Sequence, residues 1–319
     1  MEPRSVGFIG LGTMGLPMAK NLAEKLPSES KLFVFDVFAA ATSNLEASQP
    51  SGRINICETA AEVTNRADIL ITIVPAGAHV RKVFLDETAG VLAANIKGKI
   101  LIDCSTIDTE TSRLVAEEVR RKDQTAFFCD APISGGSLGA EKGTLTFMVG
   151  CAGNDERWPT LERLLCKMGK SIIPCGKQSM GLVAKLSNNY CSGLIAIATA
   201  EAMNSAMRAG MDPRILAKIF STSTAQSTIC DKWCPVPGIT PDAPSSHGYK
   251  GGFKVQLMYK DFSLAVDAAK SAGATLYLAD AGLQVYKEAS EDARCADLDS
   301  RVVFRYLGGD ENWKDSVLN

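Results

Sequence analysis

Short apolar runs alternate with amphipathic stretches from the start of the chain to about Cys175. The runs that we expect to form strands are residues 6–9, 32–35, 69–74, 100–102, 127–129, 145–149 and 171–173. Segments with helical spacing of apolar residues lie between them, for instance residues 109–121. Regular alternation of strands and helices predicts a parallel sheet with helices on both faces.

The pattern changes after Gly176. Residues 179–209 contain no proline and two glycines, Gly181 near the start and Gly193 in the middle, among Ala, Leu, Ile and Met, which predicts one long helix. Further helices are expected at residues 213–221, 256–271, 276–290 and 300–307, with no strand-like alternation. The sequence therefore predicts an α/β domain over residues 1–176 and an all-α domain over residues 177–319, which begins with the long helix.

One irregular stretch interrupts the helical half. Residues 234–252 carry P-V-P-G, two further prolines and a Gly-Gly pair. A loop of this length between helices is unusual and is often functional.

A glycine-rich turn follows the first apolar run. Its glycines have G-x-G-x-x-G spacing and lead into a helical pattern, which is the context of a dinucleotide-binding Rossmann turn. The first glycine allows the tight turn, the second lets a pyrophosphate approach the backbone, and the third lets the helix lie against the strand. A glycine turn that serves packing alone is the alternative. The residues expected to bind the dinucleotide here are Gly10, Leu11, Gly12, Thr13, Met14 and Gly15.

An acidic residue ends the second apolar run. Asp36 lies about 20 residues after Gly15, which is the spacing of the acid that binds the ribose. Its carboxylate would accept hydrogen bonds from the ribose hydroxyls and repel a 2′-phosphate. The next residues, Val37, Phe38 and Ala39, include no arginine to receive such a phosphate. We therefore predict NAD rather than NADP.

Composition excludes several classes of function. The 319 residues carry a net charge of −2 and no long basic stretch, which argues against nucleic acid as a partner. No apolar run reaches the ~18 residues of a membrane span. Ten dispersed cysteines form no C-x-x-C pair, and His79 and His247 are the two histidines, so we expect neither a metal site nor a histidine-based catalyst.

With neither a secretory nor an Arg-rich presequence visible, a cytoplasmic location is expected unless a presequence is missing from the chain.

Ligands of such sheets bind at the carboxyl ends of the strands. Three loops should lie there, at residues 74–75, 103–106 and 130–136. Ser105 and Thr106 in the second loop precede a helix, so they are equally well explained as helix caps and as cofactor contacts.

The third loop contains Ser134, Gly135 and Gly136. Two adjacent glycines after a serine expose backbone N–H groups in a concave turn, which suits an anionic oxygen such as a carboxylate. A turn that is merely flexible is the alternative.

Polar residues mark the first turns of the long helix. Lys185, Asn188 and Asn189 stand at i, i+3 and i+4, so they share one face. With no histidine expected to act as the catalyst, a lysine with a lowered pKa can take a hydroxyl proton as a hydride leaves, and a neighbouring asparagine can hold the reacting oxygen. A solvated polar face explains the same spacing equally well.

Taken together, these segments resemble the β-hydroxyacid dehydrogenase family, and within it the branch that acts on 3-hydroxyisobutyrate. The resemblance covers nearly the whole chain in five ordered blocks. They are G-F-I-G-L-G-T-M-G-L-P-M-A-K-N-L, D-A-P-I-S-G-G-S-L-G-A-E-K-G-T-L-T-F-M-V-G, G-L-V-A-K-L-S-N-N, P-V-P-G…P-S-S-H-G-Y-K-G-G-F and L-M-Y-K-D-F-S-L-A. The fourth block, residues 235–253, most resembles the hydroxyisobutyrate branch.

The resemblance implies a 6-phosphogluconate dehydrogenase-like fold and a role for each matching residue. Lys185 would be the catalytic acid/base, and Asn189 would assist at the reacting oxygen. The substrate-binding residues would be Ser134, Gly135, Gly136, Asn188 and Asp261. Further cofactor contacts would come from Val74, Pro75, Thr106 and Lys260, and from His79, which stands where the family often has asparagine.

The activity implied is NAD-dependent oxidation of 3-hydroxyisobutyrate to methylmalonate semialdehyde, a step of valine breakdown, with a small carboxylate as substrate. Family members are commonly homodimers or homotetramers, and eukaryotic ones are mitochondrial. Two alternatives stay open. One is a reductase of another short hydroxy acid or semialdehyde, of the glyoxylate or succinate-semialdehyde type, and the other is a non-catalytic NAD-binding sensor.

Overall fold

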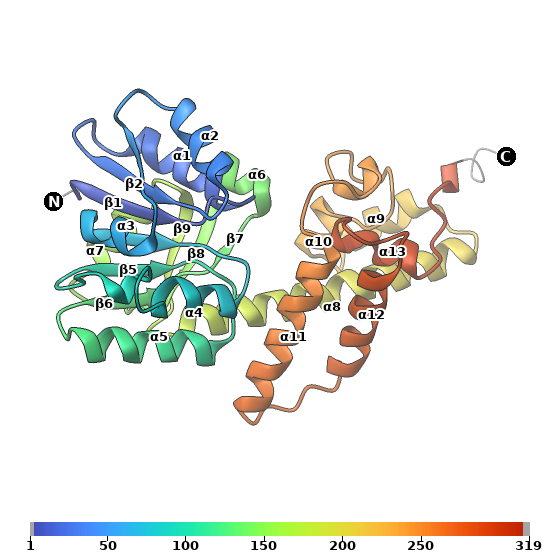
Figure 1. Cartoon of the computed structure of the whole chain (residues 1–319). Coiled ribbons are helices and arrows are strands. Elements are labelled where there is room, and N and C mark those ends of the chain that lie inside the picture. The colour runs from blue at the N-terminus through green and yellow to red at the C-terminus, as the bar shows by residue number, and fades with distance from the viewer. Residues whose placement is uncertain (1–2, 315–319) are drawn as a thin grey trace. The chain divides into compact units, whose positions relative to one another are not determined.

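The computed structural model describes residues 3–314 and contains two compact units that divide between Lys185 and Leu186. The long helix α8 (Met180–Arg208) contributes its first turns to the first unit and the rest to the second. Figure 1 shows the α/β character of the first unit and the helical character of the second. No helix among the described residues is long and apolar enough to cross a membrane.

Six parallel strands form the main sheet of the first unit, in the order β3-β2-β1-β4-β5-β6. In that order they span Ile54–Ile56, Lys31–Phe35, Ser5–Ile9, Ile69–Thr72, Ile100–Asp103 and Phe127–Asp130. The order reverses between β1 and β4, and ligands of doubly wound sheets bind outside the carboxyl ends of the strands at such a reversal. The fold thus places the glycine turn after β1 at this point.

Helices cover both faces of this sheet. They are α1 (Gly15–Lys25), α2 (Ala39–Ala47), α3 (Ala60–Arg66), α4 (Gly77–Leu85) and α5 (Thr109–Lys122), with a 3₁₀ turn η1 (Val91–Ala93). Alternate residues of β1 enter opposite cores: Phe8 packs with one apolar cluster and Ile9 with the other. Burial on both faces explains why these strands are continuous apolar runs in the sequence.

A second, three-stranded sheet completes the first unit. It contains β7 (Ile133–Ser134), β8 (Leu145–Val149) and β9 (Gly169–Pro174), and α6 (Gly136–Glu141) and α7 (Trp158–Leu165) lie between its strands in the chain. β7 and β8 are antiparallel, whereas β8 and β9 are parallel. The expectation that residues 145–149 and 171–173 continue one parallel sheet was wrong, because the chain reverses after β7 and β8 pairs back onto it.

The described residues of the second unit form helices joined by irregular segments, with one isolated β-bridge between Lys254 and Asp299. After α8 come α9 (Pro213–Thr222), α10 (Thr228–Lys232), α11 (Val255–Ser271), α12 (Ala279–Glu291) and α13 (Val303–Tyr306), with 3₁₀ turns η2 (Pro244–His247) and η3 (Ser300–Val302). Residues 300–307, expected as one helix, are η3 followed by α13.

Gly193 lets the helices of this unit pack closely. A Cβ there would lie 3.2 Å from the rings of both Phe262 on α11 and Tyr286 on α12. The Tyr286 hydroxyl donates to the Gly193 carbonyl oxygen at 2.8 Å, so the buried phenol is satisfied. α8 is thereby held against α11 and α12 in the middle of its length.

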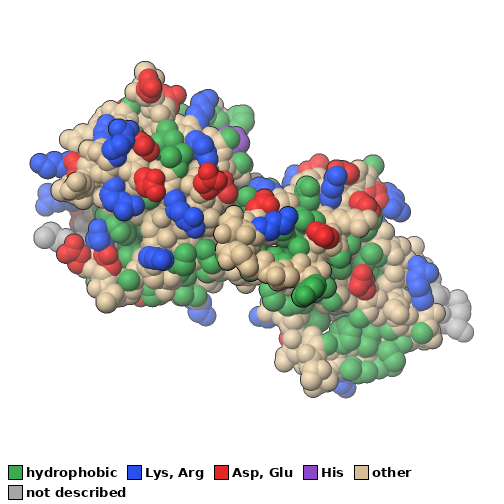
Figure 2. Space-filling view, turned by 90° about the horizontal axis from the view of Figure 1, so that it is seen from below, with side chains coloured by type: hydrophobic (Ala, Val, Ile, Leu, Met, Phe, Trp, Pro, Cys, Tyr) green, Lys and Arg blue, Asp and Glu red, His purple; other side chains and the backbone are tan. Residues whose placement is uncertain are grey.

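Lys and Arg side chains are interspersed with Asp and Glu on the face that Figure 2 shows. This distribution matches the small net charge of −2. On this face, the described residues form no continuous basic surface of the kind that follows a phosphate backbone.

Candidate active site

The three glycines of the turn after β1 differ in what surrounds them. Gly10 has a φ of +94°, and a Cβ there would lie 2.1 Å from the carbonyl oxygen of Ile73. A Cβ on Gly15 would lie 1.9 Å from the carbonyl oxygen of Gly10, whereas a Cβ on Gly12 would meet no atom within 4 Å. Gly10 and Gly15 are therefore required by the turn itself, and the space beside Gly12 is open to a ligand.

Asp36 lies directly beside this turn. Its Oδ2 accepts a hydrogen bond from the Leu11 backbone N–H at 2.6 Å, and its Oδ1 accepts one from Phe38 N–H at 2.8 Å. The carboxylate is half-buried at the end of β2, while Gly12 and Thr13 are exposed. An acid fixed next to an open glycine turn fits the adenosine ribose and pyrophosphate of a dinucleotide.

A buried polar network joins the ends of β4 and β5. Asp103 Oδ1 accepts from Thr72 Oγ1 at 2.8 Å, from Ser105 Oγ at 2.6 Å and from Ser105 N at 3.2 Å. Ser105 Oγ in turn accepts from the Val74 N–H at 2.9 Å. The network therefore fixes the loop after β4, where Val74 is half-buried and Pro75 is exposed.

The helix-cap explanation of Ser105 and Thr106 does not hold for α5. The N-cap of α5 is Asp108, whose Oδ1 accepts from the Thr111 N–H at 2.6 Å. Ser105 belongs to the buried network, and Thr106 is half-buried at the carboxyl edge of the sheet.

The Ser134–Gly136 turn has a backbone that only glycine adopts without strain. Gly135 has a φ of +133° and Gly136 a φ of +64°. The helix that follows, α6, is tied to the glycine-turn helix because Asn21 Nδ2 on α1 donates to the carbonyl oxygens of Ala140 and Glu141 at 2.9 and 3.1 Å. The helices that follow the candidate dinucleotide turn and the candidate carboxylate turn are thus linked directly.

Two of the three polar residues expected to share one face of α8 are buried. Lys185 is 7% exposed and Asn189 is 5% exposed, while Asn188 between them is exposed. The solvated-face explanation is therefore wrong for Lys185 and Asn189. Asn188 Nδ2 donates to Asn189 Oδ1 at 3.2 Å.

Asn189 is oriented by an acid of the second unit. Its Nδ2 donates to Asp261 Oδ2 on α11 at 2.7 Å, and Lys260 Nζ lies 3.2 Å from Asp261 Oδ1 as an ion pair. Asp261 is 2% exposed, so this carboxylate holds both groups with little competition from water. Two residues expected at the site, Asn189 and Lys260, thus both contact a third, Asp261.

Asp130, the last residue of β6, is a buried residue for which the sequence predicts no role. Its buried carboxylate accepts backbone hydrogen bonds from Ser179 at 2.6 Å and from Leu182 at 2.7 Å, at the start of α8. One sequence feature could have indicated its burial: the apolar runs at residues 100–102 and 127–129 are each followed directly by an aspartate, Asp103 and Asp130.

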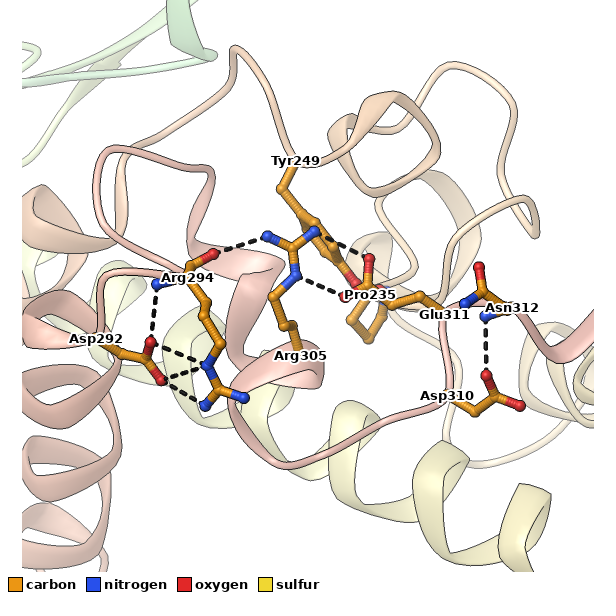
Figure 3. Close-up of polar contacts among 8 residues, drawn as sticks. All are labelled: Pro235, Tyr249, Asp292, Arg294, Arg305, Asp310, Glu311 and Asn312. Atoms are coloured by element: carbon orange, nitrogen blue, oxygen red, sulfur yellow. Dashed lines mark hydrogen bonds and ion pairs between the residues drawn. The ribbon is translucent and has the colours of Figure 1, made fainter.

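The proline-rich loop of residues 235–253 is held in place by buried polar contacts. The Tyr249 hydroxyl donates to the Pro235 carbonyl oxygen at 2.9 Å, and the ring of this fully buried tyrosine lies under the Arg305 guanidinium (Figure 3). Arg305 also binds Glu311 through Nε at 2.6 Å and through Nη2 at 3.0 Å. Burial raises the pKa of the Tyr249 phenol, which stays protonated as a donor.

The two histidines lie at the surface. His79 is exposed in the first turn of α4, and His247 is exposed at the end of η2. No group of His, Cys, Asp or Glu residues in the described part of the chain is arranged to hold a metal ion.

Comparison with known families and structures agrees with the fold of both halves of the chain. Residues 5–176 match the NAD binding domain of 6-phosphogluconate dehydrogenase, and residues 179–307 match the family described as NAD-binding of NADP-dependent 3-hydroxyisobutyrate dehydrogenase.

Individual relatives align over almost their full length. A probable mitochondrial 3-hydroxyisobutyrate dehydrogenase of Dictyostelium discoideum is 41% identical, over 98% of this chain and 93% of the relative. An NAD-dependent L-serine dehydrogenase of Pseudomonas aeruginosa is 36% identical, over 89% of this chain and 91% of the relative.

The solved structure of Mycobacterium tuberculosis 3-hydroxyisobutyrate dehydrogenase with L-serine superposes with a TM-score of 0.86 and 34% identity, over 96% of this chain and 99% of that one. These matches confirm the Rossmann and helical domains and the NAD(P)-binding character expected from the sequence. The chain belongs to the 3-hydroxyisobutyrate dehydrogenase branch of the β-hydroxyacid dehydrogenase family.

Proposed function

We propose that this protein oxidises 3-hydroxyisobutyrate to methylmalonate semialdehyde with NAD, using Lys185 as the acid/base. The observation that carries the proposal is the buried pair of Lys185 and Asn189, one turn apart on α8, in a chain whose two histidines are exposed. The Lys185 amine can accept or return a proton, and the Asn189 amide can donate a hydrogen bond from the same face of the helix. Because both side chains are buried, water competes little for either group.

The first unit supplies the residues that would hold NAD. The open backbone at Gly12 and the N–H groups at the start of α1 would receive the pyrophosphate, and Asp36 would receive the adenosine ribose. Val74, Pro75 and Thr106 would line the nicotinamide side. When bound, NAD supplies a hydride acceptor.

The chain's own residues would carry the proton chemistry. The Lys185 amine would take the hydroxyl proton of the substrate while the carbon-bound hydrogen leaves as hydride, which converts the alcohol carbon to an aldehyde. Asn189, aimed by Asp261, would donate its amide to the same oxygen. The N–H groups of the Ser134–Gly136 turn would hold the carboxylate, because positive φ values at both glycines keep that turn concave.

L-Serine is a second candidate substrate. It shares the carboxylate and the β-hydroxymethyl group of 3-hydroxyisobutyrate and differs in having an ammonium group in place of the methyl group. The Pseudomonas aeruginosa relative is named for it, and the Mycobacterium tuberculosis structure contains it. The chemistry assigned to Lys185 and Asn189 would be the same for both compounds.

Substitution of the lysine tests the assignment. Lys185→Ala should lower kcat by ~10²–10⁴ while NAD affinity changes little, because the amine serves the proton transfer. Lys177→Ala, which removes an exposed lysine just before α8, is the matched control and should keep full turnover. Unchanged turnover in a folded Lys185→Ala enzyme would refute the proposal.

Compartment and assembly are also proposed from the relatives. The Dictyostelium discoideum and mouse relatives are named mitochondrial, and we place this protein in the same compartment. Activity in the cytosolic fraction of its own cells would contradict that. We expect a homodimer or homotetramer in light scattering, and a monomer mass would contradict it.

A further inference from the structure

Asp130 occupies a buried position at the carboxyl edge of the main sheet. It is the last residue of β6, it pairs in register with Asp103 of β5, and it is 1% exposed. A buried carboxylate is unfavourable unless it is fully hydrogen-bonded. The groups that donate hydrogen bonds to the Asp130 carboxylate therefore indicate which part of the fold it stabilises.

Those partners are the free N–H groups at the start of α8. Oδ1 accepts from Ser179 N at 2.6 Å, and Oδ2 accepts from Leu182 N at 2.7 Å. The first N–H groups of a helix have no hydrogen-bond partner within the helix. A negative charge beside them is also stabilised by the positive end of the helix dipole. Asp130 thus caps α8 from a strand that lies 49 residues earlier in the chain.

The backbone around this cap is closely packed. A Cβ on Gly150 would lie 2.0 Å from Asp130 Oδ1, and a Cβ on Gly181 would lie 2.1 Å from the Met148 carbonyl oxygen. Ser179, next to the first residue of α8, is held in the left-handed region with a φ of +70°. The first turn of α8 is consequently packed closely against the ends of β6 and β8.

The same strand end also carries the candidate carboxylate turn. Ser134 follows Asp130 by four residues, and the Asp130 carbonyl oxygen accepts from Gly150 N at 2.7 Å, which joins β6 to the end of β8. The side chain of Asp130 therefore binds the helix that bears Lys185, while its backbone is continuous with the turn at Ser134.

We infer that Asp130 is a positioning residue of the catalytic centre, which sets the place of Lys185 relative to the Ser134–Gly136 turn. The inference rests on the proposed role of Lys185. A displacement of about 1 Å at a reacting group can lower turnover on the order of 10²-fold, so the seating of α8 should appear in kcat.

Asp130→Asn tests this with a small change in shape. The two N–H donors bind different oxygens of Asp130, so an amide can accept from one and must turn its NH₂ group toward the other. Asp103→Asn is the matched control, because it is an equally buried acid on the neighbouring strand whose three hydrogen bonds all end on Oδ1, which the amide keeps. We expect Asp130→Asn to lower kcat at least about tenfold more than Asp103→Asn does, with KM for NAD within about threefold of the parent value.

A double-mutant cycle separates positioning from loss of fold. In a Lys185→Ala background, Asp130→Asn should lower the residual kcat less than about twofold, because the group that it positions is already gone. Multiplicative losses in the double variant would overturn the inference, as would an Asp130→Asn enzyme with full kcat. If Lys185→Ala keeps its turnover, the proposed role of Lys185 is refuted, whatever the result for Asp130→Asn. Circular dichroism and thermal midpoints of all variants show that the compared enzymes are folded.

Discussion

Asp103 should make the stability of the first unit depend on pH in an unusual direction. The side chain is fully buried, and burial raises its pKa from 3.8 to about 6, while hydrogen bonds from Ser105 and Thr72 act in the opposite direction. The folded protein therefore holds this proton at a pH where the unfolded chain has lost it. Stability is lost as pH rises from 3.8 toward 6, and the loss at neutral pH is about 3 kcal/mol.

Asp103→Asn removes the ionisation and keeps the shape. All three hydrogen bonds to Asp103 end on Oδ1, which the amide oxygen replaces. The difference in unfolding free energy between parent and variant should therefore shift in favour of the variant by about 2 kcal/mol between about pH 4.5 and about pH 7.5.

Urea unfolding followed by tryptophan fluorescence measures this shift. Trp158 in α7 is the single tryptophan of the first unit, so a Trp233→Phe, Trp313→Phe background makes the signal report on that unit. Asp130, whose pKa is also raised by burial, is present in both proteins, so its contribution largely cancels. Parallel stability curves for the two proteins across this range would refute the reasoning.

The glycine turn and Asp36 give further predictions. Gly15→Ala should lower both the thermal midpoint and NAD affinity, because its Cβ would lie 1.9 Å from the Gly10 carbonyl oxygen, whereas Gly12→Ala should lower NAD affinity alone. Equal thermal losses in the two variants would contradict this, and a thermal scan with and without NAD measures both effects. Asp36→Ala should raise KM for NAD about tenfold and move the NAD-to-NADP preference toward NADP, because it removes a charged acceptor of the ribose and the repulsion of a 2′-phosphate. A parent enzyme that prefers NADP in steady-state assays would show that the interpretation of Asp36 is wrong.

The elements that the sequence predicts well are those set by short-range patterns. The apolar run of β1 and the glycine spacing after it lie within a few residues, and both elements stand where they are expected. β3 was missed because its three residues, I-N-I, are too few to show a period, and Ile56 is 40% exposed. β7 was missed because two residues form a strand only once β8 lies beside them.

Short-range patterns also limit what the sequence predicts about the candidate site. Spacing alone puts Lys185 and Asn189 on one face of a helix, but it cannot distinguish a buried face from a solvated one. The contacts that decide the matter join residues far apart in the chain: Asn189 meets Asp261 over 72 positions, and Asp130 meets Leu182 over 52. Such pairs leave no local signal, so a buried carboxylate that caps a distant helix is visible only in the folded structure.

Steady-state kinetics of the purified protein with a panel of substrates tests whether it oxidises 3-hydroxyisobutyrate with NAD. The panel contains 3-hydroxyisobutyrate, L-serine, glyoxylate and succinate semialdehyde, each assayed with NAD(H) and NADP(H). We expect the highest kcat/KM for 3-hydroxyisobutyrate with NAD, and loss of that activity in Lys185→Ala. Preferred reduction of glyoxylate or succinate semialdehyde, or no turnover of any β-hydroxy acid, would contradict it.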